Sequence, residues 1–254
     1  MQQKLGIATR FYGLDPKDKR RLKTWIDAAL TVVSEKYVYI AINAELDKSG
    51  SYAFVRKNYP AINVFSVTPW GKVVQAPNAL LIKSAEHKLT YLLFTSTEYP
   101  VFKSFISRLI SYFDSVTLVV GARLPTHDFV ASEKETVLVK EANGLQIPWN
   151  TFAMWSLDHL IHTGFVLTAD SFTDPNNAGM EEMGTIAAQQ ILWRGNAIAK
   201  LVSPKEGELI ANTYNWTIER HKRHTQIMKS KNSRSRLQLE RLSLPAPAIY
   251  HIDS

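Results

Sequence analysis

The feature that most constrains the fold is the alternation of short apolar runs with segments of helical pattern over the first 121 residues. Between the runs, apolar residues recur every three or four positions, as in Leu22, Trp25, Ile26 and Ala29. Alternating strands and helices predict a parallel α/β sheet, and near-continuous apolar strands agree because such strands are buried on both faces. The predicted strands are residues 5–10, 37–44, 62–67, 90–94 and 116–121. The first predicted helix begins at Asp15 and Pro16, and the other three cover residues 51–58, 76–87 and 101–113.

Polar residues follow several of the predicted strands. They are Thr9, Arg10, Asn43, Glu45, Thr97 and Glu98. Because the carboxyl ends of parallel strands lie along one edge of an open sheet, and ligands bind at that edge, we expect these side chains to face a binding site.

The composition excludes several classes of protein. There are no cysteines, which excludes disulfides, thiolate catalysis and cysteine zinc sites. Neither the Gly-rich dinucleotide fingerprint nor the P-loop pattern is present, which disfavours NAD enzymes and P-loop NTPases. No apolar run reaches about 18 residues and no secretory signal pattern opens the chain, so the cytoplasm is the expected location.

The positive charge is concentrated near the end of the chain. The segment from Arg220 to Arg241 contains eight Lys and Arg residues and one acid, Glu240, which equals the net charge of +7 of the whole sequence. The rest of the chain is therefore neutral, and an anionic ligand is expected at this basic tail.

A second informative stretch runs from Ile147 to Glu182. Ala153, Leu157, Leu160 and Ile161 have helical spacing, which predicts a helix that Gly164 and Phe165 end. A polar loop over residues 173–178 follows, and then Glu181 and Glu182 open a second predicted helix. Acids at a helix N-terminus often only complement the helix dipole. With aromatic residues nearby, this loop also suits a site that binds a polyol and removes a proton from it.

This order of elements resembles the acceptor half of glycosyltransferases with the A-type (GT-A) nucleotide-sugar fold, of the family 2 kind. The resemblance covers residues 4–200, mostly as an order of elements. In that family a Gly-Phe pair and then an acidic pair follow a polar, aromatic segment, and one acid is the general base on the acceptor hydroxyl. The resemblance therefore implies that Glu181 or Glu182 is catalytic, and Glu182 is favoured because the family's base is usually the second acid.

For the donor, the resemblance implies contacts of Thr9 and Arg10 with the nucleotide and of Glu45 with the base or ribose. The helix before the fourth strand commonly touches the nucleotide in this family. The additional donor-binding candidates are Asn78, Lys83, Thr97 and Glu98.

The family's metal motif is degenerate here. Where an Asp-x-Asp motif is expected to hold Mg²⁺ or Mn²⁺, the chain reads Ser96-Thr97-Glu98, with a single carboxylate. A cation that also binds substrate phosphates can use one or two carboxylates, so Glu98 is a metal candidate. Glu98 could equally cap the following helix. In several A-type enzymes a C-terminal His joins the metal, which makes His221 and His224 further candidates.

Acceptor binding is expected at Trp149, Asn150, Trp155 and His127. Aromatic faces suit the apolar faces of sugar rings, and Asn can both donate and accept hydrogen bonds. Core packing is the alternative for Trp155, and simple exposure is the alternative for His127.

The basic tail reads as a basic helix followed by a looser segment. It could neutralise the donor diphosphate, hold an anionic acceptor or a membrane surface, bind nucleic acid, or be a solvated helix. Met228, Leu237 and Leu239 favour packing against the body and therefore the first role.

The fold class predicted from the sequence is a single GT-A-like α/β domain with a mostly parallel sheet. We assign residues 1–125 to a donor half, 126–205 to an acceptor half and 206–254 to the basic tail.

The predicted function is glycosyl transfer from a nucleoside diphosphate sugar to an unidentified acceptor, with a divalent cation. The alternatives are a nucleotidyltransferase, a non-catalytic nucleotide- or sugar-binding protein, and an RNA-binding protein. Nucleic acid is disfavoured as a partner, and peripheral membrane contact stays open.

Overall fold

The computed structural model describes residues 4–12, 18–43, 45–48, 50–131, 136–171, 174–209 and 218–253. These residues form one sheet with the strand order β3-β2-β1-β4-β7-β5-β8-β9-β6. The strands are β1 (Leu5–Phe11), β2 (Val38–Asn43), β3 (Asn63–Val67), β4 (Tyr91–Thr95), β5 (Thr117–Ala122), β6 (Thr136–Val139), β7 (Phe152–Ser156), β8 (Ile198–Val202) and β9 (Ile249–Ile252). The sheet is mixed but mostly parallel: only β7, between β4 and β5, and β6, beside β9, run antiparallel to their neighbours.

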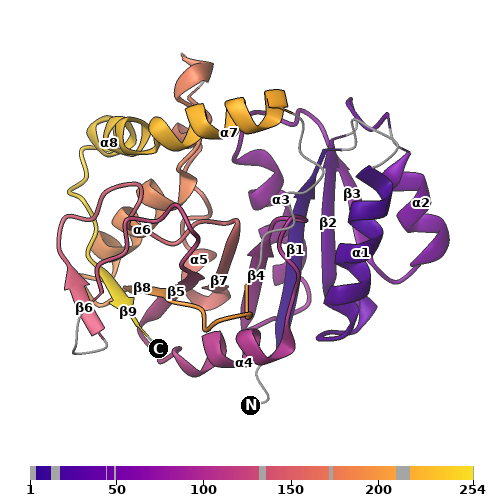
Figure 1. Ribbon diagram of the computed structural model, residues 1–254, viewed down its shortest axis with the longest axis horizontal. Coiled ribbons are helices and arrows are strands. Elements are labelled where there is room, and N and C mark those ends of the chain that lie inside the picture. Colours follow the sequence, from indigo (N-terminus) through magenta and orange to yellow (C-terminus); the bar gives the residue numbers. More distant parts are fainter. Residues whose placement is uncertain are drawn as a thin grey trace.

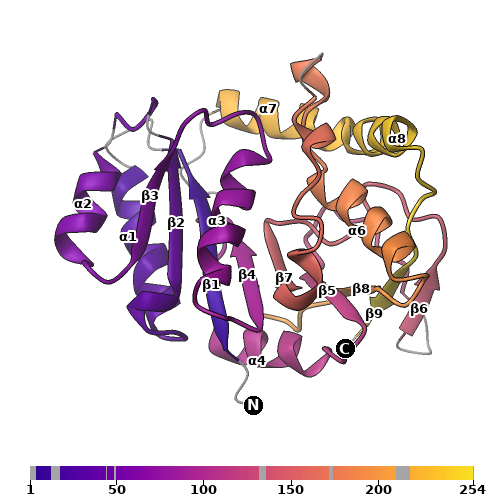
Figure 2. The same cartoon turned by 180° about the vertical axis from the view of Figure 1, so that it is seen from behind.

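Helices cover both faces of this sheet. The α-helices are α1 (Asp18–Leu30), α2 (Ser51–Asn58), α3 (Gln75–Ala85), α4 (Lys103–Ser111), α5 (Leu157–Leu160), α6 (Glu181–Leu192), α7 (Ile218–Lys229) and α8 (Lys231–Leu242), and the 3-10 helices are η1 (Glu35–Tyr37), η2 (Leu167–Asp170) and η3 (Pro175–Asn177). α1 lies on the face nearer the viewer in Figure 1, whereas α3 and α6 lie on the face seen in Figure 2. Every residue of β2 is buried, as expected for a strand covered on both sides. No described helix is of the length and apolarity that crossing a membrane requires.

The predicted elements of the donor half are confirmed to within two residues. This holds for all five predicted strands and for the helices over residues 51–58, 76–87 and 101–113. The helix predicted to begin at Asp15 and Pro16 is observed from Asp18, and its predicted start lies outside the described residues. α1 buries Leu22, Trp25, Ile26 and Ala29, which lie on one face at helical spacing.

The helix predicted from Ala153 onward is wrong at its start. Residues Phe152–Ser156 form the fully buried strand β7, and only the single turn α5 is helical. β7 lies between β4 and β5 in the middle of the sheet, so a continuous apolar run is needed there on both faces. Trp155 therefore belongs to a strand and is completely buried.

The looser segment predicted after the basic helix is also wrong. Residues Lys231–Leu242 form a second helix, α8, which packs against α6 and η2. α7 lies across the carboxyl ends of the strands in both views (Figures 1 and 2), and β9 returns to the sheet beside β8. The C-terminal segment is therefore part of the domain. The division of the chain into donor half, acceptor half and tail stays a prediction.

Candidate active site

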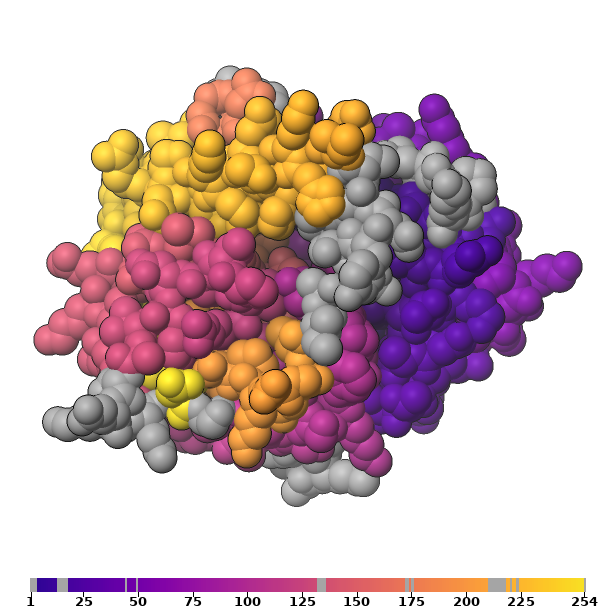
Figure 3. All heavy atoms as spheres, viewed as in Figure 1, coloured from indigo at the N-terminus to yellow at the C-terminus, as the bar shows by residue number. Residues whose placement is uncertain are grey.

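Several of the site candidates lie at the edge of the sheet where β1, β4 and β5 end. β7 runs antiparallel to β4 and β5, so its beginning lies at that same edge, with Phe152 opposite Thr95. A hydrogen bond from the Ser96 N–H to the Thr151 carbonyl, 2.9 Å, continues this pairing past the strand ends. In Figure 3, α7 and α8 form the upper margin of this face, and the surface is hollowed directly below α7.

Two buried carboxylates lie at this edge. Glu181 and Glu182 open α6, and each is 5% exposed. The Asn150 N–H donates to Glu182 Oε1 at 2.6 Å, and the Asn150 side-chain amide donates to Glu181 Oε1 at 3.2 Å. The Trp155 indole N–H donates to Asn150 Oδ1 at 2.8 Å. One asparagine thus joins both predicted catalytic acids to a fixed tryptophan in the central strand.

The pair perturbs the ionisation of Glu182. Burial, reinforced by the adjacent Glu181 carboxylate, raises the pKa of Glu182 from 4.5 to about 7, although Lys231 and the Asn150 N–H favour the charged form. A carboxylate with a pKa near the working pH is suited to general base catalysis. Strongly shifted groups of this kind are frequent at functional sites.

α8 holds the turn that leads into this pair. Arg234 Nη1 donates to the Ala178 carbonyl at 2.6 Å, and the Gln238 amide donates to the Gly179 carbonyl. Gly179 and Met180 have positive φ values of 111° and 66°, so the turn depends on glycine and is held by these bonds. A Cβ on Gly179 would lie 2.2 Å from Arg234 Nη1. Sequence reasoning missed both Arg234 and Gln238 in this role.

A stack of aromatic rings lies beside the pair. Trp149 is 3% exposed, its indole N–H donates to the Gly144 carbonyl at 2.9 Å, and its ring stacks on His127 at 3.7 Å between centroids. The Leu124 N–H donates to His127 Nδ1, and His127 Nε2 lies 3.0 Å from the Ile147 carbonyl. Both ring nitrogens are therefore used by the main chain, and burial lowers the pKa of His127 to about 3. His127 supports Trp149 and has no ring nitrogen left for a sugar hydroxyl.

Arg10, at the end of β1, faces the same region. Arg10 is partly open to solvent, and its Nη1 donates to the Val73 carbonyl at 3.2 Å. Desolvation lowers its pKa, but nearby Tyr12, Glu181, Glu182 and Asp170 more than offset this and raise it. Asp170, another residue missed from the sequence, accepts hydrogen bonds from the N–H groups of Lys72, Val73 and Val74. These bonds fix the loop before α3 against the end of η2.

The other predicted donor residues have partners of their own. Asn78 exchanges two hydrogen bonds with the main chain of Phe165, and Lys83 pairs with Glu86 on the surface of α3. Thr9 is buried at the end of β1, Glu45 is exposed beyond β2, and Thr97 lies in the turn after β4. The structure thus brings Arg10 to the acidic pair but gives Asn78 and Lys83 structural contacts within and beside α3.

The described residues do not form a preformed metal site. No group of three or more His, Asp or Glu side chains suited to a cation is found among them. Glu98 is paired with Arg21 at 3.2 Å and accepts a hydrogen bond from the Ser96 hydroxyl. His221 and His224 lie on α7, exposed and half-buried respectively. A single carboxylate already paired with a guanidinium is a poor ligand for a hard cation without help from phosphates.

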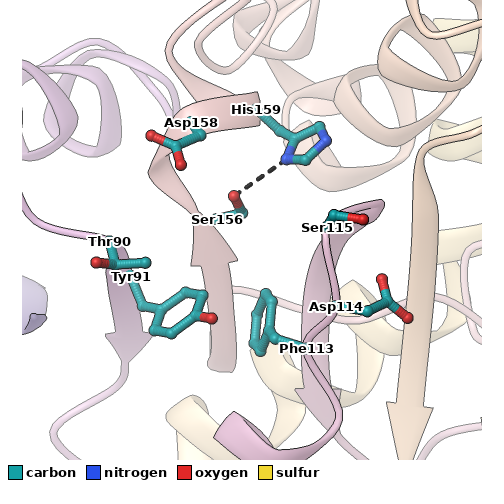
Figure 4. A pocket seen from close by; sticks show the side chains of 8 residues that line it. All are labelled: Thr90, Tyr91, Phe113, Asp114, Ser115, Ser156, Asp158 and His159. Atoms are coloured by element: carbon teal, nitrogen blue, oxygen red, sulfur yellow. Dashed lines mark hydrogen bonds between the residues drawn. The ribbon is translucent and has the colours of Figure 1, made fainter. Parts of the chain in front are cut away.

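Two cavities lie away from this edge. One, of about 430 Å³, is lined by Tyr91, Phe113, Asp114, Ser156, Asp158 and His159 near the opposite ends of β4 and β5 (Figure 4). There the Ser156 hydroxyl and His159 Nδ1 lie 3.1 Å apart, and Asp114 bonds Thr117 and Lys200. The other, of about 420 Å³, lies between α3 and residues 161–164. Neither cavity is lined by Glu181 or Glu182.

Comparisons with known proteins agree on the fold. A mannosyltransferase from Pyrobaculum calidifontis, solved in complex with GDP-Man and Mn²⁺, aligns with TM-score 0.60 and 11% identity over 95% of this chain and 65% of its own. TarS residues 1–349 from S. aureus, solved in complex with UDP-GlcNAc, aligns with TM-score 0.51 and 11% identity over 85% of this chain and 62% of its own. The chain therefore spans less than two thirds of the length of either structure. No protein-family model and no curated protein matches the sequence. At this identity the likeness shows a GT-A-like fold.

Proposed function

We propose that this protein is a glycosyltransferase that moves a sugar from a nucleoside diphosphate sugar to a hydroxyl of an acceptor. The observation that carries the proposal is the buried Glu182 carboxylate, which accepts the Asn150 N–H at 2.6 Å at the ligand edge of a GT-A-like sheet. Its pKa of about 7 suits a base that is half ionised near neutral pH.

In the proposed reaction Glu182 removes the proton from the acceptor hydroxyl while the oxygen attacks the anomeric carbon of the donor. A bond forms between that oxygen and the anomeric carbon, and the bond from the carbon to the diphosphate oxygen breaks. The nucleoside diphosphate leaves with the electron pair, and the proton stays on Glu182. This single displacement inverts the anomeric configuration. The Asn150 N–H would hold the base in place, and Glu181 would hold the Asn150 side chain.

The donor would lie along the ends of β1, β2 and β4. Thr9, Arg10, Glu45, Thr97 and Glu98 are the proposed contacts for the nucleotide. Asn78 and Lys83 would act indirectly, through the position of α3. Trp149, Asn150 and Trp155 would shape the acceptor side, with the two indoles as supports rather than open sugar platforms, because both are buried.

The diphosphate charge would be offset by cations of α7, which lies across this edge (Figure 1). Lys222 and Lys229 are exposed on α7. In the GT-A fold a divalent cation supplies charge neutralisation at the donor phosphates, and the mannosyltransferase with a similar fold was solved with Mn²⁺. Because the described acids and histidines do not form a site by themselves, we assign no step of the reaction to a metal here. Glu98, His221 and His224 remain candidate ligands that would need the nucleotide to complete the site.

Two alternatives are weighed by specific contacts. A non-catalytic nucleotide- or sugar-binding protein on the same scaffold is favoured by the Arg21–Glu98 ion pair, which occupies the usual metal carboxylate. An RNA-binding role is disfavoured because Lys231 and Arg234, two of the eight tail cations, are buried against the body.

A thermal-shift panel of nucleoside diphosphates and their sugars, with and without Mn²⁺, tests the donor site. A ligand at a hundredfold excess over its dissociation constant stabilises the protein by about 2.7 kcal/mol. The proposal expects one nucleoside diphosphate to raise the unfolding temperature of the protein. In an assay with added acceptors, the corresponding nucleoside diphosphate sugar should slowly be converted to the free nucleoside diphosphate. Absence of any shift across the panel would remove the donor site. Binding without turnover for every acceptor would favour the non-catalytic alternative.

The role of α7 needs charge variants, because a truncation from Arg220 would also remove β9 from the sheet. The double variant Lys222→Gln, Lys229→Gln should weaken the binding of the nucleoside diphosphate and leave nucleoside binding unchanged, since only the former carries phosphates. Lys57→Gln, an exposed residue on α2, is the matched control. If the double variant binds both the nucleoside diphosphate and the nucleoside as tightly as the wild type does, α7 belongs to a partner surface instead.

A further inference from the structure

The proposed reaction leaves one buried cation at the site without a role. Lys231 is the first residue of α8 and only 8% exposed. An ammonium has three N–H donors, and burial of such a charge is costly unless it is compensated. The contacts of Lys231 Nζ are the Met180 sulfur at 3.5 Å, a weak acceptor, and the Trp149 ring, whose centroid is also 3.5 Å away. Neither contact supplies a full negative charge.

The backbone around Lys231 fixes the position of this ammonium. A Cβ on Gly144 would lie 2.6 Å from the Lys231 carbonyl oxygen, so the start of α8 lies directly against Gly144. The Gly144 carbonyl in turn accepts the Trp149 indole N–H. Lys231 Nζ and the His127 ring both lie against the Trp149 ring, at 3.5 and 3.7 Å from its centroid. The Lys231 ammonium therefore lies against a buried aromatic ring that is itself held in place.

Charged groups from three elements meet around the base. Glu181 lies beside Glu182 on α6, Lys231 and Arg234 come from α8, and Arg10 comes from β1. Burial lowers the pKa of Lys231 to about 8, while the Glu182 carboxylate is the strongest of the charges that raise it. Lys231 Nζ lies against Met180, two residues before Glu182, and against Trp149, which directly precedes the asparagine that donates to Glu182. Arg234 is bonded to the Ala178 and Ile227 carbonyls, and Arg10 to the Val73 carbonyl.

We infer that Lys231 is a positioning residue for the proposed base: an ammonium that α8 holds on the face of Trp149, where its charge offsets the carboxylate charge of Glu182 beside Glu181. This inference rests on the proposed function of Glu182. It assigns α8 a part in the chemistry, because the helix brings a compensating charge to an acidic pair about fifty residues earlier in the chain. It also explains why a lysine occupies a buried position where a methionine would pack at lower desolvation cost.

The first test is the pH profile of turnover in wild type, Lys231→Met and Lys231→Arg. Loss of the Lys231 charge should raise the apparent pKa of the proposed base, Glu182, by about 1 unit in the Met variant. Turnover near pH 7 should therefore fall up to about tenfold and recover at higher pH. The KM for the donor should not change. Lys231→Arg keeps the charge and should restore the wild-type profile. Arg236→Met, at a 78% exposed cation on the same helix, should leave the profile unchanged. A Met variant whose turnover falls equally at every pH has lost only structure, which would overturn the inference.

The second test needs no turnover and separates the inference from the proposed function. The ¹³C signal of the Glu182 carboxyl is titrated in wild type and in Lys231→Met, with Glu182→Gln used to assign it. The inference expects the midpoint to move to higher pH in the Met variant and to return in Lys231→Arg. If it moves although no acceptor is ever glycosylated, the charge relation stands and the proposed function fails. An unchanged midpoint in Lys231→Met would overturn the inference whatever the activity.

Discussion

Glu98, the candidate metal ligand after β4, and Glu182, the favoured candidate base at the start of α6, lie in different environments. Glu98 faces the guanidinium of Arg21 at 3.2 Å and the Ser96 hydroxyl. Glu182 faces another acid, accepts the Asn150 main-chain N–H and has Lys231 as a compensating charge. An acid paired with arginine has its charge satisfied by the protein, whereas an acid beside an acid holds its proton to higher pH. The two environments agree with the proposal that Glu182, and not Glu98, is the group that takes up a proton.

The largest expected effect comes from removing the base. Glu182→Gln keeps the shape of the side chain but not its basicity, so turnover should fall by about a hundred- to ten-thousandfold while donor binding stays nearly unchanged. Glu181→Gln should cost less, because its contact is with the Asn150 side chain. Steady-state turnover together with calorimetric donor binding measures both. Glu240→Gln, an exposed acid on α8, is the matched control. Full activity in both Gln variants would leave the pair with only a helix-dipole role.

The second effect is on stability as a function of pH. The pKa of Glu182 is raised in the folded state from 4.5 to about 7, so the folded protein binds the extra proton between these values. The contribution of Glu182 to the free energy of unfolding is therefore fully present below about pH 4.5 and is lost as the pH rises through 7. The total loss is of the order of 3 kcal/mol. His127, with a pKa lowered to about 3, acts in the opposite direction over part of this range. Urea unfolding of wild type and Glu182→Gln at a series of pH values isolates the Glu182 contribution as the difference between them. A difference that does not change between pH 5 and 8 would show that Glu182 ionises normally.

A third effect tests the turn that positions the pair. Gly179→Ala combines a positive φ of 111° with a contact of 2.2 Å to Arg234, whereas Gly195→Ala has a positive φ of 81° with nothing within 4 Å of the new Cβ. The strained φ costs about 1 kcal/mol or more in either variant, and displacing Arg234 should add roughly 1–2 kcal/mol in the first. Chemical denaturation gives both values. Equal losses in the two variants would mean that Arg234 adjusts freely and does not hold the turn.

The smallest effect is expected in the donor half. Glu98→Gln removes one of the two acids paired with Arg21, the other being Asp18, together with a proposed donor contact, so the donor dissociation constant should rise severalfold. The pH profile of turnover should keep its midpoint, because Glu98 does not face Glu182. Donor titration with and without Mn²⁺ then shows whether Glu98 contributes through a metal. A shifted pH midpoint in Glu98→Gln would break the division of roles between the two halves.

The donor half of the fold could be predicted because its strands are continuous apolar runs and its helices have regular apolar spacing. The sequence predicts a helix at β7 because Ala153, Leu157, Leu160 and Ile161 have helical spacing, but periodicity alone does not distinguish a short buried strand from a buried helix. α8 was missed for a different reason. Its buried face has helical spacing, but in polar residues: Lys231, Arg234, Ser235 and Gln238 are buried together with Leu239. An apolar pattern search does not detect a polar stripe.

The candidate site could be predicted only in part. The adjacent acids and the aromatic segment before them were visible in the sequence, and the structure brings them together through Asn150. The environment that shifts the pKa of Glu182 could not be predicted, because it depends on burial and on Lys231, which lies 49 positions away on a helix that the pattern did not indicate. Partners such as Phe165 for Asn78 likewise arise from tertiary contacts alone.

A structure of the protein with a bound nucleoside diphosphate sugar tests the central claim most directly. The account predicts that the diphosphate lies below α7 at the ends of β1 and β4, with the sugar directed toward the Glu182 carboxylate. Density for the ligand in the cavity lined by Tyr91, Phe113 and His159 at the opposite edge of the sheet, with the acidic pair remote from the sugar, would contradict it.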